Sequence, residues 1–167
     1  MMRTLIAGVL LAATIISATP ADARLEYPQP YRGELTDAFT RPAIHSRLSR
    51  FIIHKRGTPE RVAADFAEAL SQTRWPATLA AIGAAEGTFN PNEPRGSAGE
   101  MGAFRIIPKH WGKVPKDIAG QVRQAERVFA KLVAQYGYRK AIVRYNGSGP
   151  RAEAYAQWVL KQVRRIG

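Results

Sequence analysis

Glu86 is the residue whose position in the sequence most favours catalysis. It follows Leu79 and Ile82 at helical spacing, so the three side chains share one face of a helix expected to begin at Pro76. Burial on such an apolar face raises the pKa of a carboxyl group, and the negative end of the helix dipole acts in the same direction. A Glu that stays protonated near neutral pH is a ready general acid. The alternative interpretation is a surface carboxylate at a frayed helix end.

Three short motifs follow one another along the chain: Glu86-Gly87, Gly102-Ala103-Phe104-Arg105 and Arg144-Tyr145-Asn146. Together they resemble the lytic transglycosylases with a soluble-lytic-transglycosylase (SLT) catalytic domain, which are related in fold to goose-type lysozyme. That family carries Glu-Ser at a helix end, then Gly-Leu-Met-Gln, then Ala-Tyr-Asn, in the same order and at similar spacing. The resemblance covers about residues 76–158.

The resemblance implies that peptidoglycan glycan strands are the substrate. Glu86 would protonate the glycosidic oxygen between N-acetylmuramic acid and N-acetylglucosamine. It would then act as a base toward the muramic 6-hydroxyl, which closes a 1,6-anhydro ring through an oxocarbenium-like transition state. Neither a cofactor nor a metal ion is implied.

The sequence departs from the family pattern at three positions. Gly87 replaces Ser, Arg105 replaces Gln, and Arg144 replaces Ala. The Glu, the first Gly of the second motif and the Tyr-Asn pair are kept, so the expected fold and general acid are kept too. The change from an amide to a guanidinium at Arg105 alters a common substrate contact.

Five residues are expected to bind substrate beside Glu86: Met101, Phe104, Arg105, Tyr145 and Asn146. For Phe104 the alternatives are a sugar platform and a core aromatic residue. Arg105 could contact the muramic lactyl or peptide carboxylates, or pair with Glu86 and lower its pKa. Tyr145 could steady Glu86 or the sugar. Asn146 could bond an acetamido group, or belong to an ordinary Asn-Gly turn.

Glu100 is a possible second acid, because it lies in the loop expected to line the cleft. A second carboxylate that positions water would make the protein a muramidase-type hydrolase. The alternative is a solvated loop acid, or an ion pair with Arg95 or Arg105.

Other kinds of site are disfavoured. The chain has no cysteine, and His45, His54 and His110 lack the spacing of metal ligands. We therefore predict no metal site and no cofactor.

The composition favours anionic partners. The 167 residues include 25 Lys and Arg against 13 Asp and Glu, a formal net charge of +12. Such a surface attracts polyanions. Two further hypotheses follow: an inactive SLT-like module that binds glycan in the cell envelope, and a basic envelope protein that binds DNA or an anionic polymer. We expect a monomer without specific nucleic-acid binding.

Residues 1–23 are predicted to be a secretory signal peptide. Arg3 precedes an apolar run from Leu5 to Ile16, and Ala21-Asp22-Ala23 supplies a cleavage site. The run is too short for a membrane span. The mature chain would begin at Arg24, in the periplasm or outside the cell.

Three parts are expected in the chain: the signal peptide, an N-terminal arm or linker over residues 24–56, and an SLT-like catalytic domain over residues 57–167. The arm is rich in Pro and Gly up to about Pro42. The domain is predicted to be mostly α, a lysozyme-like helical fold with a cleft. Helices are expected after Thr58-Pro59, which would cap the first one, and after Trp75-Pro76. Others are expected from Ile118 to Tyr136, from Arg139 to about Tyr145, and after Pro150. Gly87 is expected as the C′ residue of its helix, and Pro108 is expected to close a short helical turn.

Overall fold

The computed structural model describes residues 41–167, with side chains from Ala43 onward. This part of the chain forms seven helices: α2 (Arg41–Arg56), α3 (Glu60–Ser71), α4 (Pro76–Glu86), α5 (Pro108–Trp111), α6 (Ile118–Tyr136), α7 (Tyr138–Asn146) and α8 (Pro150–Ile166). Its only β pairing is an isolated bridge between Met101 and Ile106. The prediction of a mostly α fold is confirmed.

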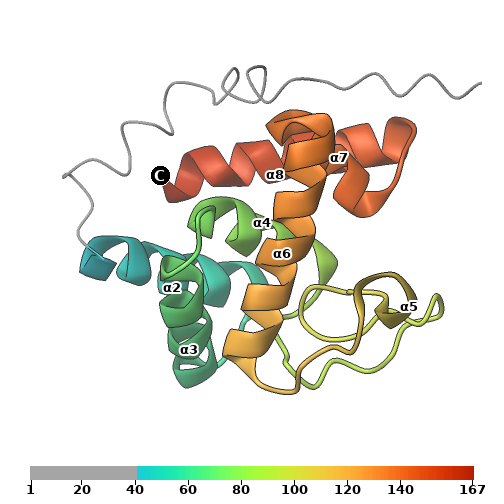
Figure 1. Ribbon diagram of the computed structural model, residues 1–167. Helices are drawn as coiled ribbons and strands as arrows, with labels where there is room; N and C mark the ends of the chain where they lie inside the picture. The colour runs from blue at the N-terminus through green and yellow to red at the C-terminus, as the bar shows by residue number, and fades with distance from the viewer. Residues whose placement is uncertain (1–40) are drawn as a thin grey trace, which may run out of the picture.

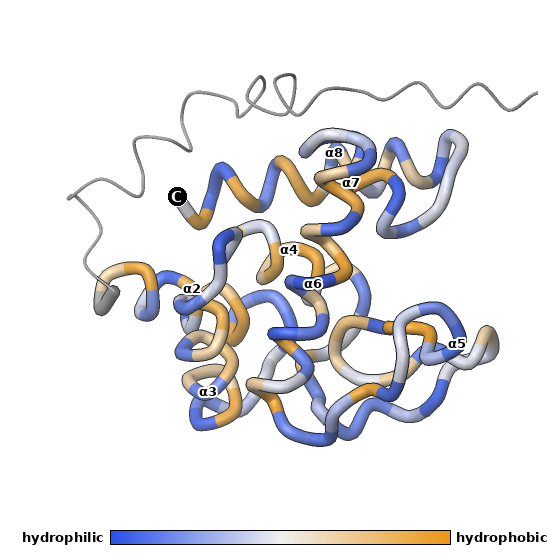
Figure 2. Tube along the Cα trace, in the orientation of Figure 1, coloured by the Kyte–Doolittle hydropathy of each residue, from blue (hydrophilic) through white to orange (hydrophobic). Residues whose placement is uncertain are grey.

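The helices surround α4. In Figure 1, α6 runs through the middle of the view, with α2 and α3 to one side, the loop that carries α5 to the other, and α8 across the top. Every residue of α4 from Ala77 to Ala84 is buried. A helix that is apolar all round is stable only inside a protein. Figure 2 accordingly shows a largely hydrophobic α4, whereas hydrophobic and hydrophilic stretches alternate along α8.

The boundary expected for the N-terminal arm is wrong. Residues 41–56 form helix α2, which packs along α3. Leu48 and Ile52 of this helix are fully buried, and Ile44 lies against the core one turn earlier. Apolar residues at four-residue spacing therefore place α2 inside the domain. The expected signal peptide and residues 24–40 of the arm lie outside the described residues.

Three phenylalanine rings pack where α4 ends. The ring of Phe66 lies 5.1 Å from that of Phe89 and 6.4 Å from that of Phe104, edge to face in both cases. A Cβ on Gly83 would lie 2.8 Å from the Phe89 ring. Only glycine lets α4 approach these rings so closely.

The long helices after residue 117 match the predicted segments. Asp117 accepts a hydrogen bond from the backbone N–H of Gly120 and so caps α6, which ends before Gly137.

Two local predictions are wrong. The Thr58 hydroxyl donates to the Thr88 carbonyl at 3.1 Å instead of capping α3. Pro108 begins α5 instead of closing a helical turn, because proline is favoured at the first helical position.

None of the helices in the described residues combines the length and the apolar character needed to cross a membrane.

Candidate active site

Glu86 is the last residue of α4, and the end of that helix is fixed from outside. Arg56, the last residue of α2, donates hydrogen bonds from its guanidinium to the Ala84 carbonyl, with the Nε atom at 2.6 Å. The last carbonyl groups of a helix have no partner within it, and a cation is favourable at that end of the dipole. Arg56 therefore fixes the backbone just before Glu86.

Gly87 is required by a close approach of the chain. A Cβ at this position would lie 2.9 Å from the carbonyl oxygen of Ala103. The backbone of Gly87 is extended, with φ −148°, so the predicted C′ glycine ends α4 without the left-handed conformation of that motif. A serine at this position would make the same close contact.

The loop from Gly87 to Asp117 is held by one buried amide of α6. Gln121 accepts a 2.9 Å hydrogen bond from the backbone N–H of Ala103, and its Nε2 atom donates to the carbonyls of Pro91 at 2.8 Å and Pro115 at 3.0 Å. Three distant parts of the loop therefore contact one side chain, which sets the position of the 102–105 motif relative to α6.

The second motif forms a tight turn. The Met101 and Ile106 backbones exchange two hydrogen bonds, of 2.9 and 3.0 Å. Arg105 adopts a positive φ of 50° within the turn, which is uncommon for a residue with a side chain. The Tyr145 hydroxyl donates a 3.2 Å hydrogen bond to the Phe104 carbonyl, and this bond joins the turn to the end of α7.

The environment of Glu86 favours its protonated form. Burial raises the pKa of the carboxyl, and the charge of Glu100 adds to that effect. Tyr155, Asn146 and Arg105 act in the opposite direction, in that order of size. The Oε1 atom of Glu86 is buried and has no hydrogen-bond partner within the described residues. A catalytic role is one explanation for an unsatisfied buried acceptor of this kind.

Tyr155 is the site residue that the sequence analysis missed. It belongs to the apolar stripe of α8, and its buried hydroxyl has no partner in the hydrogen-bond network of the described residues. The pKa of this hydroxyl is raised well above its usual range by burial and by the neighbouring Glu86. Burial and Glu86 also raise the pKa of Tyr145. The sequence could have indicated Tyr155, because a tyrosine in an otherwise apolar stripe buries a hydroxyl that needs a polar neighbour.

Glu100 and Arg105 form an ion pair with 2.5 Å between Arg105 Nη2 and Glu100 Oε1. Of the sequence-based alternatives for Glu100, the structure has the ion pair with Arg105. The pKa of Glu100 is lowered by its own backbone N–H first, and also by Arg105 and the backbone of Ala98. Arg105 also lowers the pKa of Glu86 from a distance, without an ion pair between the two.

The other three predicted site residues, Phe104, Met101 and Asn146, differ in burial and in what they contact. The Phe104 side chain is only 1% exposed and packs in the core, so the sugar-platform interpretation is wrong and the core interpretation is confirmed. Met101 is half-buried, and its sulfur lies 3.5 Å from the guanidinium of Arg95. Asn146 is exposed at the last position of α7 and approaches the Glu86 carboxyl. The structure therefore brings Glu86, Asn146, Tyr145 and Arg105 together.

Comparison of the chain with known protein families, with curated proteins and with solved structures found no match.

Proposed function

We propose that this protein cleaves peptidoglycan as a lytic transglycosylase. One observation carries the proposal. Glu86 is a carboxyl group whose pKa is raised by burial, its Oε1 atom is unpartnered, and Tyr155 and Asn146 lie beside it. A proton donor with an unpartnered oxygen beside an exposed amide group suits a sugar substrate. The resemblance of the three motifs supplies the substrate class.

The proposed reaction uses Glu86 twice. Its carboxyl gives a proton to the glycosidic oxygen, and the bond from that oxygen to the muramic C1 breaks, so that N-acetylglucosamine leaves with a free hydroxyl group. The resulting carboxylate then takes the proton of the muramic 6-hydroxyl as that oxygen bonds to C1. The acid is regenerated, no water is consumed, and an oxocarbenium-like transition state lies between the two steps.

The neighbours of Glu86 have separate roles in this proposal. Tyr155 lies close enough to lower the pKa of Glu86, so it would stabilise the carboxylate formed between the two steps. The exposed Asn146 amide would bond an acetamido group of the substrate. Arg105 has part of its charge balanced by Glu100, and would contact a muramic lactyl or peptide carboxylate.

The test is a mass analysis of the products released from intact peptidoglycan sacculi. The chain from Arg24 to Gly167 is incubated beside a Glu86→Gln variant. Muropeptides with a 1,6-anhydro end, lighter by one water than the reducing form, are expected from the unmodified chain. The variant should release less than about 1% as much, since general acid catalysis contributes at least about 100-fold. Folded protein that binds sacculi but releases no product would be a binding module.

A hydrolase is the second candidate, and a specific observation favours it. The pKa of Glu86 is raised while that of Glu100 is lowered, and the charge of Glu100 contributes to the raised pKa of Glu86. Two carboxyl groups with opposite shifts are the usual arrangement for an acid and a base. Products with reducing ends, lost in a Glu100→Gln variant, would establish this reaction instead.

A further inference from the structure

A hollow of about 560 Å³ lies between α2 and α8, lined by residues different from those around Glu86. Its lining includes five basic side chains and no acidic side chain: Arg47, Arg50, His54, Lys55 and Arg165. We call it the basic hollow. Its volume is in the range of ordinary ligand sites, and its charge would attract an anion.

Three of the five basic residues decide what the hollow can bind. Arg47 donates to the backbone carbonyls of Ile166 and Gly167, and so links the start of α2 to the end of α8. Lys55 and Arg165 have no ion pair or hydrogen bond to another side chain in the part of the chain described. These two cations, one from each helix, are available to an oxyanion.

Gln162 gives the hollow a second, independent feature. Its side chain is 2% exposed and lines the hollow, and its Oε1 atom has no hydrogen-bond partner in the described structure. A buried acceptor without a partner is costly, and a donor group of a bound molecule would relieve that cost. The missing partner must be a donor, such as a hydroxyl or an amide N–H, which a fully ionised anion does not have.

The ring of Phe51 completes the lining as a half-buried apolar surface. Oxyanion-binding cations, a hydroxyl acceptor and an aromatic surface together fit a sugar that carries acidic groups. We propose that the basic hollow binds a segment of an acidic glycan, with its carboxylate or phosphate groups on Lys55 and Arg165 and a sugar hydroxyl on Gln162. The proposal does not depend on cleavage at Glu86.

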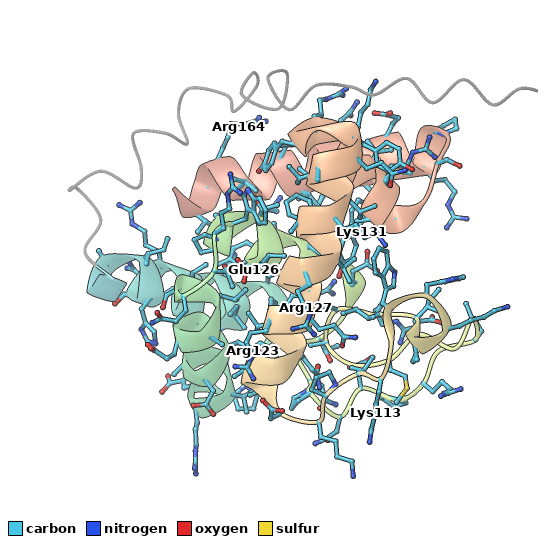
Figure 3. The ribbon with its side chains drawn as sticks, viewed as in Figure 1. Lys113, Arg123, Glu126, Arg127, Lys131 and Arg164 are labelled. Carbon is cyan, nitrogen blue, oxygen red and sulfur yellow. The ribbon has the colours of Figure 1, made fainter. Side chains whose placement is uncertain are left out.

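The test compares two charge-reversal variants by isothermal titration calorimetry, each with folding verified by circular dichroism. Lys55→Glu/Arg165→Glu changes the hollow. Arg123→Glu/Lys131→Glu makes the same change in net charge on the exposed face of α6 (Figure 3). The probes are tetragalacturonate for carboxylates, glucose 1-phosphate for a phosphate, and chitotetraose as the neutral sugar.

An acidic probe should bind the unmodified chain more tightly than chitotetraose does. The hollow variant should weaken that binding about 10- to 100-fold, as expected for lost charge-assisted hydrogen bonds, and the α6 variant less than about threefold. Whichever acidic probe binds more tightly identifies the acidic group. Equal losses of affinity in both variants would show that the acidic probe is attracted only by the overall charge. If chitotetraose bound as tightly as the acidic probes, charge would have no role in binding. Either result would overturn the proposal, as would tighter binding of a DNA duplex at the same residues.

Gln162→Leu tests whether the buried amide of Gln162 takes part in binding. Leucine fills a similar volume without a buried acceptor, so the variant should fold at least as stably as the unmodified chain. Its affinity for the acidic sugar should fall about fivefold or more, whereas that for inorganic pyrophosphate, which has no sugar hydroxyl, should stay the same. Unchanged affinity for the acidic sugar would overturn the proposal.

Discussion

The Tyr145 hydroxyl and the Phe104 carbonyl are joined by a 3.2 Å hydrogen bond that spans 41 positions of the chain. It connects the last turn of α7 with the turn that carries Arg105. Asn146 follows Tyr145 directly, so the same bond fixes the backbone from which the Asn146 amide reaches Glu86. By contrast, the second tyrosine near Glu86, Tyr155, has a buried hydroxyl without such a partner.

Removing each hydroxyl should therefore have a different effect. Tyr145→Phe should lower the free energy of unfolding by about 1 kcal/mol, because it leaves the Phe104 carbonyl without its donor. Tyr155→Phe should change stability by less than about 0.5 kcal/mol and lower the cleavage rate about tenfold. Urea unfolding and the rate of muropeptide release measure the two effects. Equal stability losses in the two variants would show that Tyr155 has a structural role.

Introducing serine at position 87, as in the resembling family, should destabilise this protein. The new Cβ would lie 2.9 Å from the Ala103 carbonyl oxygen, and backbone atoms must move to relieve that contact. Gly87→Ser should therefore destabilise the fold by about 1–3 kcal/mol, as overpacking does. Ala85→Ser, two residues earlier in α4, is the matched control and should cost about 0.5 kcal/mol. Thermal unfolding would compare them, and a stable Gly87→Ser variant would contradict the proposed contact.

The raised pKa of Glu86 makes stability depend on pH in a definite direction. The folded protein holds this proton to a higher pH than the unfolded chain does, so its contribution is fully present below the unfolded pKa and is lost as pH rises through the folded pKa. Glu86→Gln removes that loss. The free energy of unfolding of Glu86→Gln, relative to that of the unmodified chain, should therefore be higher at pH 7 than at pH 4, as measured by urea unfolding. A larger advantage at pH 4 would contradict burial of the carboxyl.

The charges of Glu100 and Arg105 should shift the pH profile of cleavage in opposite directions. Glu100 raises the pKa of Glu86, and Arg105 lowers it. If protonated Glu86 is the acid, Glu100→Gln should shift the alkaline limb of the profile to lower pH, and Arg105→Gln should shift it to higher pH.

The exposed ion pair of Arg139 and Glu153, 3.6 Å apart, supplies the matched control for this experiment. Its charges are not among those that act on Glu86, so Arg139→Gln should leave the limb in place. Shifts in the same direction for Glu100→Gln and Arg105→Gln would show that Glu86 is not the titrating group.

The sequence predicted those helices whose ends have strong local signals. Pro76 starts α4 and Gly137 ends α6, and both effects depend on the backbone of a single residue. Helix α2 was missed although Ile44, Leu48 and Ile52 are four residues apart, because its Arg, His and Ser residues and the proline-rich stretch before it obscured the stripe. Four of the polar residues of α2, Arg47, Arg50, His54 and Lys55, line the basic hollow.

The candidate site was predictable only in part. The position of Glu86 at the end of a buried helix followed from the spacing of its apolar neighbours. The pairing of Arg105 with Glu100 instead of Glu86 depends on a tight turn with a positive φ at Arg105, which no pattern in the sequence indicates. Tyr155 reaches Glu86 only because α8 packs on α4, and that contact joins segments far apart in the chain.

The three hydrogen bonds of Gln121 also determine how the loop beside Glu86 can move. Pro91, Ala103 and Pro115 are bound to one side chain of α6, so each of these segments must break its hydrogen bond to Gln121 before it opens, and a displacement of Gln121 releases all three. The loop and the first turns of α6 should therefore exchange their amide protons as one cooperative unit. The flexibility available to the turn that carries Arg105 is consequently set by the local unfolding free energy of α6, not by the length of the loop.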